Sequence, residues 1–301
     1  MWALTAWSIG YSCLRMNKLF ALIAFLLTLS FVGACSGGQT GGLRGLSLAP
    51  EQNTEDQKPN DDYIFYNGVY TKALDIPKNE LDGSLFVRSK NGRISYGGDV
   101  SAVLGVDVSE WMGPIDWEAV AGDGVHFAIL RAGRRGYTEG GLFTDGKFDE
   151  YYEGATEAGL DVGAYFFSQA VSVAEAEEEA RLMLSILDGR PLQLPVYFDW
   201  ELPAKHARTK NVSAETLTKC AVAFCRIIED AGYTPAFYAS MDIAYTRYNL
   251  ESMSGYSFWY AQYSGKPTYH YKFDIWQYSR SGKVKGIKYD ADLNLMFLFE
   301  D

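Results

Sequence analysis

The chain has 301 residues, of which 48% are hydrophobic and 22% are charged, and this is the composition of a globular protein with a sizeable core. Residues 1–35 contain Arg15 and Lys18 but no acidic residue, so the rest of the chain carries 25 basic residues against 38 acidic ones. Such an acidic body disfavours nucleic acid as a partner, because binding a polyanion requires lysine and arginine to neutralise phosphates.

The first 35 residues have the layout of a secretory signal. An apolar run over residues 19–34 follows Lys18 and ends in small residues immediately before Cys35. A positive region, an apolar region and small residues before a cleavage site are the parts of a signal peptide. The ending Val32-Gly33-Ala34-Cys35 resembles a lipobox. We therefore predict lipidation at Cys35 and an extracytoplasmic, membrane-anchored bacterial lipoprotein, with an uncleaved membrane anchor as the alternative.

Two short segments precede the main domain. Residues 36–62 are rich in glycine and then in polar residues, which predicts a flexible tether. Residues 63–100 are predicted to form a small β segment. Within it, residues 84–96 form two alternating runs about Asn91-Gly92, a strong hairpin signal.

Neither metal nor disulfide chemistry is indicated. The three histidines are scattered without the spacing of metal ligands, so we expect no metal and no cofactor. Cys220 and Cys225 lie five positions apart in a predicted helix, on different faces, and we interpret them as small buried side chains.

Residues 101–301 alternate between predicted strands and helices. Helices are predicted at 147–159, after Ser172 with Glu175 three residues later as a capping box, and at 212–233. The acidic run Glu175–Glu179 is interpreted as a solvent-exposed helix face. The predicted strands are 103–109, 127–133, 161–168, 194–201, 234–240, 258–263, 274–279 and 291–297.

Strands that alternate with helices predict an α/β fold with a parallel sheet, and eight of them favour closure into a TIM-like barrel. An open doubly wound sheet is the alternative, which is less favoured because no glycine-rich phosphate loop follows the first strand.

Four carboxylates fall at the ends of predicted strands. Asp199 and Glu201 lie two positions apart in LPVYFDWEL, so a strand would direct both to the same side. Asp107 ends the first strand, and Asp292 lies in the last one. Because reactive residues of β/α barrels lie at one mouth, we expect these acids to converge. Further candidates at strand ends are Arg131, Tyr165, Tyr238, Trp259, Tyr263 and Gln277.

Acids that flank a bond in a cleft lined by aromatic residues are the apparatus of glycoside hydrolysis. Neighbouring carboxylates raise one another's pKa, so that one of them stays protonated at neutral pH and can act as a general acid.

The motif GVDVSEWMGPIDW, at residues 105–117, resembles the opening motif of the glycoside hydrolase family 25 lysozymes, the Chalaropsis-type muramidases. FAILRAG, VGAYFF, PVYFDWE, FWYAQY, IWQYS and DADLNLMF resemble the later motifs of that family, in order, so the resemblance covers residues 103–299. It implies a distorted barrel of the (β/α)5(β)3 type, with five helix-linked strands and then three more. It also implies retaining cleavage of the β-1,4 bond between N-acetylmuramic acid and N-acetylglucosamine in peptidoglycan. We expect a monomer.

By this resemblance Glu201 matches the general acid/base and Asp199 its partner, while Asp107 and Asp292 match the family's other two acids. Asp292 is preferred to Asp290 because it begins Asp-Leu-Asn. Two roles stay open for Asp199: covalent nucleophile, or partner of the substrate's own N-acetyl group. The family's aromatic cleft positions are matched by Tyr165, Tyr238 and Tyr263.

The chain departs from the family pattern at two places. Met112 stands where glutamine is frequent, and RAGRRG from Arg131 replaces the commoner Lys-Ala-Thr-Glu-Gly. Both changes predict altered contacts with substrate.

Three other functions are alternatives to a lysozyme: a chitinase-like hydrolase, an inactive binding protein and a structural lipoprotein. Family 18 chitinases also end a strand in Asp-x-Glu, but their motif has acids where this chain has Leu194 and Tyr197. A catalytically inactive, membrane-tethered peptidoglycan-binding protein is disfavoured by the presence of all four acids. A structural lipoprotein without affinity for glycans is the third alternative.

Overall fold

The computed structural model describes residues 62–203 and 205–299. The predicted signal peptide, Cys35 and all but the last residue of the predicted tether therefore lie outside the described residues. Within the described part of the chain, no helix has the length and the apolar character needed to cross a membrane.

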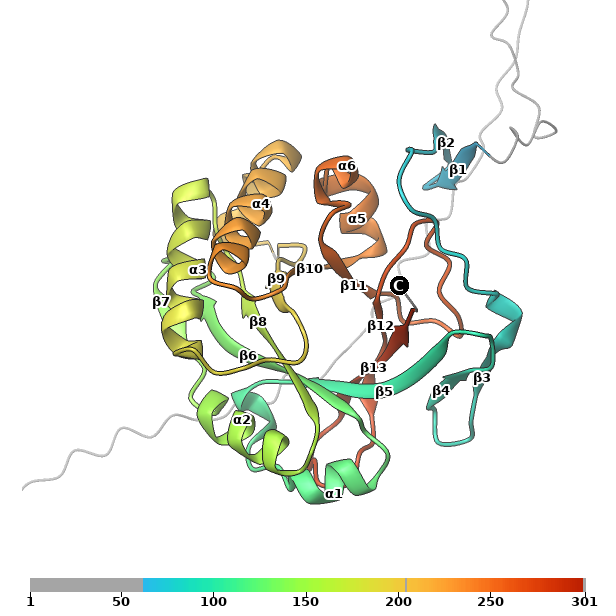
Figure 1. The fold of residues 1–301 in the computed structure, drawn as a ribbon. Helices are drawn as coiled ribbons and strands as arrows, with labels where there is room; N and C mark the ends of the chain where they lie inside the picture. The colour runs from blue at the N-terminus through green and yellow to red at the C-terminus, as the bar shows by residue number, and fades with distance from the viewer. Residues whose placement is uncertain (1–61, 204, 300–301) are drawn as a thin grey trace, which may run out of the picture. The chain divides into compact units, whose positions relative to one another are not determined.

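Eight strands close into a barrel (Figure 1). From β5 (Ser101–Val108) to β12 (Ile275–Gly282), neighbouring strands of the barrel pair in parallel. The last strand, β13 (Ala291–Leu298), pairs antiparallel with both β12 and β5. The predicted closed α/β barrel is therefore confirmed, and the open doubly wound sheet is wrong. The eight strands are β5 (Ser101–Val108), β6 (Phe127–Arg135), β8 (Asp161–Phe167), β9 (Val196–Asp199), β10 (Pro235–Ser240), β11 (Ser257–Ala261), β12 (Ile275–Gly282) and β13 (Ala291–Leu298).

Helices follow the first five of these strands. Ser172 begins a helix as predicted, since its hydroxyl accepts a hydrogen bond from the Glu175 N–H at 3.4 Å. Ser213, which was not singled out from the sequence, caps α4 (Ala214–Asp230) in the same way. Beyond β11 the described chain passes from strand to strand without an α-helix. The helices are α1 (Trp117–Gly122), α2 (Phe148–Glu157), α3 (Val173–Leu187), α4 (Ala214–Asp230), α5 (Met241–Arg247) and α6 (Leu250–Met253).

Alternation along the strands divides the core into two parts. One set of side chains fills the interior of the barrel and includes Phe127, Tyr197 and Trp259. The other set faces the helices and includes Phe198 and Phe224. Gly105 is needed for the interior packing, because a Cβ atom there would lie 2.2 Å from the ring of Phe127.

Two hairpins precede the barrel. The predicted one is formed by β3 (Phe86–Arg88) and β4 (Ile94–Tyr96), preceded by the 3-10 turn η1 (Gly83–Leu85). The other, formed by β1 (Tyr63–Tyr66) and β2 (Val69–Lys72), was not singled out from the sequence.

The β1–β2 hairpin carries the same turn signal as the predicted one. Asn67 and Gly68 connect its strands with φ angles of 49° and 81°, as a two-residue hairpin turn requires.

Some sequence-based expectations are corrected by the structure. A short strand, β7 (Leu142–Thr144), was not predicted and pairs antiparallel with β6. Strand β9 ends at Asp199, so Glu201 lies just beyond the strand.

The interpretation of Glu175–Glu179 as a solvent-exposed face is wrong for Glu175 and Glu179, although Glu178 is exposed. Glu179 is 0% exposed and pairs with Arg135, while Glu175 pairs with Arg208. The reason is that two buried or partly buried arginines, from other elements, contact this face of α3.

Candidate active site

A cavity of about 470 Å³ opens at the carboxyl ends of the parallel strands. It contains every site residue proposed from the sequence for the barrel, together with Trp111, Arg134 and Phe167, which were missed. Because β13 runs antiparallel, its first residues reach the same mouth, and Asp292 lies opposite Asp107 in the register. The cavity is lined by Asp107, Trp111, Arg131, Arg134, Tyr165, Phe167, Asp199, Glu201, Tyr238, Trp259, Tyr263, Gln277 and Asp292.

Asp107 is held by two amide side chains. Its Oδ2 accepts a hydrogen bond from Gln277 Nε2 at 2.9 Å and another from Asn294 Nδ2 at 2.8 Å. Asn294 in turn accepts from Trp259 Nε1 at 2.8 Å. Tyr263 donates to Gln277 Oε1 at 2.8 Å. These contacts set the orientation of both amides, so that each presents its NH₂ group to the carboxylate.

Asp107 and Asp292 form a coupled pair of carboxyl groups. Burial raises the pKa of Asp107 to about 6, although hydrogen bonds from Asn294, Gln277 and Asp292 work in the opposite direction. Burial, followed by repulsion from Asp107 and Glu201, raises the pKa of Asp292 to about 8. At neutral pH the shared proton therefore resides on Asp292, which donates it to the Asp107 carboxylate.

Asp199 and Glu201 form the second pair of acids. Burial raises the pKa of Asp199 well above its ordinary value, and Glu201 and Asp107 add to this effect. Asp199 Oδ1 is buried without a hydrogen-bond partner. Glu201 lies at the exposed rim. Partial loss of hydration, then repulsion from Asp107, raises its pKa, whereas Arg280 opposes the rise. Both shifts are in the direction that favours the protonated form.

The arginines of the cavity have different surroundings. The guanidinium of Arg131 donates to Asp145 Oδ2 at 2.7 Å and to Glu110 Oε1 at 3.0 Å. Arg131 is therefore buried in ion pairs within the protein, although it was proposed to bind substrate. Arg134 lies over the ring of Phe143, with 4.4 Å from its Cζ to the ring centroid.

Aromatic rings form the walls. Trp259 makes edge-to-face contacts with Tyr238 at 4.7 Å and with Tyr165 at 5.9 Å between ring centroids. At the rim, Trp111 is 69% exposed and Tyr263 is half exposed. Exposed rings of this kind provide flat apolar faces on which a sugar ring can stack. Met112, the departure from the family pattern, packs against the core and is not among the residues that line the cavity.

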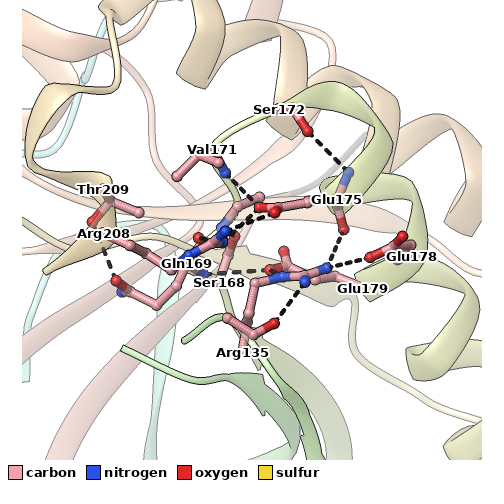
Figure 2. A network of polar contacts seen from close by, with 12 residues as sticks. Arg135, Ser168, Gln169, Val171, Ser172, Glu175, Glu178, Glu179, Arg208 and Thr209 are labelled. Carbon is pink, nitrogen blue, oxygen red and sulfur yellow. Dashed lines mark hydrogen bonds and ion pairs between the residues drawn. The ribbon is translucent and has the colours of Figure 1, made fainter. Parts of the chain in front are cut away.

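A network of ion pairs braces the loops around the mouth (Figure 2). Arg208, which lies in the segment after Glu201, donates to Glu175 at 2.6 and 2.7 Å and to the Gln169 carbonyl at 2.8 Å. Arg135, at the end of β6, donates to Glu179 Oε1 at 2.8 Å and to the Glu175 carbonyl at 2.8 Å. The network therefore connects the segment that follows Glu201 to β6, α3 and the loop after β8.

No group of three or more His, Cys, Asp or Glu side chains in the described ranges is arranged to hold a metal ion.

A barrel whose mouth gathers coupled carboxyl groups among aromatic rings has the equipment of a glycoside hydrolase. The family model of the Glycosyl hydrolases family 25 matches residues 106–287. The chain belongs to this family and is a glycoside hydrolase.

Known proteins resemble the chain over most of the barrel. It is 31% identical over 203 residues to the uncharacterized protein YegX of Escherichia coli K12, covering 64% of this chain and 69% of that protein. It is 29% identical over 214 residues to Lysozyme M1 of Streptomyces globisporus, covering 65% of this chain and 68% of that protein.

A solved structure shows the same fold. The modular autolysin LytC of Streptococcus pneumoniae, in complex with a synthetic peptidoglycan ligand, superposes with a TM-score of 0.58 at 22% identity. The match covers 77% of this chain but only 56% of the LytC chain, so this chain spans little more than half of LytC.

Proposed function

We propose that this protein is a lysozyme that cleaves the β-1,4 bond between N-acetylmuramic acid and N-acetylglucosamine in peptidoglycan, with net retention. Membership in the family, the similarity to Lysozyme M1 and the fold shared with a peptidoglycan-bound autolysin support the substrate class. The observation that carries the proposal is the placement of Glu201 and Asp199 in one cavity, both with raised pKa values.

In this proposal Glu201 is the general acid and then the general base. Its protonated carboxyl group donates a proton to the glycosidic oxygen as the bond from that oxygen to C1 of the sugar breaks, while C1 forms a bond either to the Asp199 carboxylate or to the oxygen of the substrate's own N-acetyl group. Water displaces that group from C1 in the second step. In the second step the Glu201 carboxylate removes a proton from the water that attacks C1, which returns the enzyme to its starting state. Two displacements at C1 give net retention.

Asp199 is the partner of Glu201 in the first displacement. Its Oδ1 is buried without a partner, so it is available to bond to a group of the bound sugar. Asp107 and Asp292 hold one proton between them and set the charge beside the scissile bond. Trp111 and Tyr263 at the rim offer stacking surfaces for neighbouring sugar rings.

We further propose that the domain acts outside the cytoplasm from a lipid-anchored position. The lipobox-like sequence before Cys35 and the glycine-rich segment after it support this placement. At about 5–6 Å multiplied by the square root of the residue number, a tether of this length would reach roughly 25–30 Å from a membrane.

The test compares wild type with Glu201→Gln on purified peptidoglycan and identifies new reducing ends by mass spectrometry. We expect N-acetylmuramic acid at the reducing ends from wild type, and a loss of rate of at least about 10²–10⁴-fold in Glu201→Gln. Glu118→Gln is the matched control, because Glu118 is exposed on α1 and does not line the cavity.

Other results would change the assignment. N-acetylglucosamine at the reducing ends would indicate a glucosaminidase on the same fold. Near-normal activity of Glu201→Gln would contradict the role given to Glu201. Binding to the wall without any product from wild type would favour the non-catalytic binding protein.

A further inference from the structure

A second cavity, of about 550 Å³, lies between the β1–β2 hairpin and the barrel. One wall comes from β1, and the residues 78–79 extend it. The opposite wall comes from the start of α5 and from the loop between β11 and β12. The cavity is lined by Tyr63, Ile64, Phe65, Tyr66, Lys78, Asn79, Met241, Tyr245, Pro267, Thr268, Tyr269 and His270.

Half of this cavity is made by residues that precede the family match. The match begins at residue 106, whereas Tyr63–Tyr66, Lys78 and Asn79 belong to the segment before the barrel. The hairpin is held in place by Tyr66, whose hydroxyl donates to Asp242 Oδ1 at 2.9 Å and whose ring lies 4.8 Å from that of Tyr245. The segment therefore adds a concave surface to the barrel of the family.

The chemistry of this surface differs from that of the active site. Among the described residues that line it, none carries a carboxylate group, whereas the active-site cavity is lined by four. Tyrosine and phenylalanine rings provide its apolar surface, and Tyr63 and Phe65 are 43% and 60% exposed. Such rings, mixed with hydroxyl, amide and imidazole groups, suit the alternating apolar faces and polar edges of sugars.

Two polar groups of this wall lack a partner. The Tyr269 hydroxyl and His270 Nε2 are buried without a hydrogen bond, and Tyr269 is 2% exposed. Buried polar groups without a partner carry a cost in free energy. Burial, then repulsion from Lys78, lowers the pKa of His270, so its ring is neutral at pH 7 and can bond to an uncharged sugar.

The second cavity is adjacent to the first one along the chain and in space. The loop after β11 places Tyr263 in the active-site cavity and Thr268 in the second cavity. Gln262 connects the two, because its side chain donates to Thr268 Oγ1 and accepts from the Thr268 N–H, both at 2.8 Å. The two cavities therefore take lining residues from the same braced loop.

We propose that the β1–β2 hairpin and the loop between β11 and β12 form a second, non-catalytic glycan-binding site, which holds a strand of the polymer that the active site cleaves. The proposal rests on the peptidoglycan hydrolase activity proposed above. A concave site with hydrogen-bonding groups fits sugar rings, whereas a flat lipid surface would leave those groups without partners. The site would raise affinity for polymeric substrate and have no effect on the bond-breaking step.

The experiment measures binding of the full chain to purified peptidoglycan glycan strands from which the stem peptides have been removed. Glu201→Gln is the background, so that the strands stay intact. We expect Phe65→Ala, and Tyr63→Ala as a second variant, to weaken binding by about three- to tenfold, as loss of one aromatic contact would. Val87→Ala is the matched control, since Val87 is 61% exposed in the other hairpin and does not line the cavity.

A second measurement separates this inference from the proposed activity. With Glu201 intact, Phe65→Ala should raise KM for polymeric peptidoglycan and leave kcat/KM for a tetrasaccharide unchanged. Unchanged strand binding in both hairpin variants would overturn the inference, whatever the activity of wild type. Loss of binding to anionic phospholipid vesicles, with unchanged strand binding, would overturn it in favour of a membrane-facing hairpin.

Discussion

Individual side chains of the active site perform different tasks because their surroundings differ. Asp107 receives two amide hydrogen bonds, so its negative charge is stabilised even though it is buried. Asp292 lacks those donors and faces the charges of Asp107 and Glu201, so it keeps its proton to higher pH. Two chemically identical groups in register on neighbouring strands are therefore separated in pKa by what each one contacts.

Asp292 offers a test of this separation through stability. Its pKa is about 8 in the folded protein against an ordinary value of 3.8, so at intermediate pH the folded state holds a proton that the unfolded chain has released. The free energy of unfolding therefore decreases as the pH rises from about 4 to 8. We expect Asp292→Asn to increase it by about 1–2 kcal/mol at pH 8, allowing for partial exposure, and by little at pH 4.

Urea denaturation at the two pH values measures this difference. Asp290→Asn is the control, because Asp290 lies two positions before Asp292 but is exposed and pairs with Lys283. Equal effects of Asp292→Asn at both pH values would contradict the raised pKa.

Among the elements, the segment after β9 is the one that carries Glu201. The strand ends at Asp199, so hydrogen bonds of the sheet do not hold Glu201. The segment is instead anchored further along by Arg208 and by Thr209, whose hydroxyl donates to Gln169 Oε1 at 3.2 Å. We therefore expect Arg208 and Thr209 to act on the reaction by positioning the segment that carries Glu201.

We expect Arg208→Gln to decrease kcat several-fold with a smaller change in KM, and to cost about 1–3 kcal/mol of stability, because a bidentate charge-assisted contact is lost. Kinetics and thermal unfolding measure the two effects. Lys219→Gln removes an exposed ion pair with Glu215 on α4 and should change neither.

Arg208→Lys should restore part of kcat, since lysine keeps the charge but loses the bidentate geometry. An Arg208→Gln enzyme with normal kcat and reduced stability would show that the contact serves only the fold.

On the scale of the whole molecule, the chain combines a barrel of family 25 with an added amino-terminal segment and a proposed lipid anchor. We expect Cys35→Ala to move the protein from the membrane fraction to the soluble one, because a lipid chain is the proposed anchor. Fractionation, with mass spectrometry of the amino-terminal peptide, measures this change. Activity on soluble glycan strands should be unchanged, and membrane retention of Cys35→Ala after signal cleavage would contradict lipidation.

Features that depend on a short stretch of sequence could be predicted, whereas contacts between distant residues could not. Barrel strands were predicted to within a few residues, because hydrophobic runs are local signals. The helix after Ser172 was predicted for the same reason, because a capping serine is also a local signal. The β1–β2 hairpin carries an equally local Asn-Gly signal and could have been found. Trp111 follows a strand end closely and could also have been proposed. By contrast, nothing near Glu179 in the sequence indicates that its partner, Arg135, is 44 positions away.

The sequence by itself determined the barrel, the family and most of the residues that gather at its mouth, because alternation, strand-end position and ordered motifs are properties of short stretches. The tertiary structure alone decided which charges are engaged and which are available. It paired Arg131 with Asp145 and Glu110, buried Glu179, left Asp199 Oδ1 without a partner and formed the second cavity. These outcomes depend on contacts between residues far apart in the chain, which local patterns do not encode.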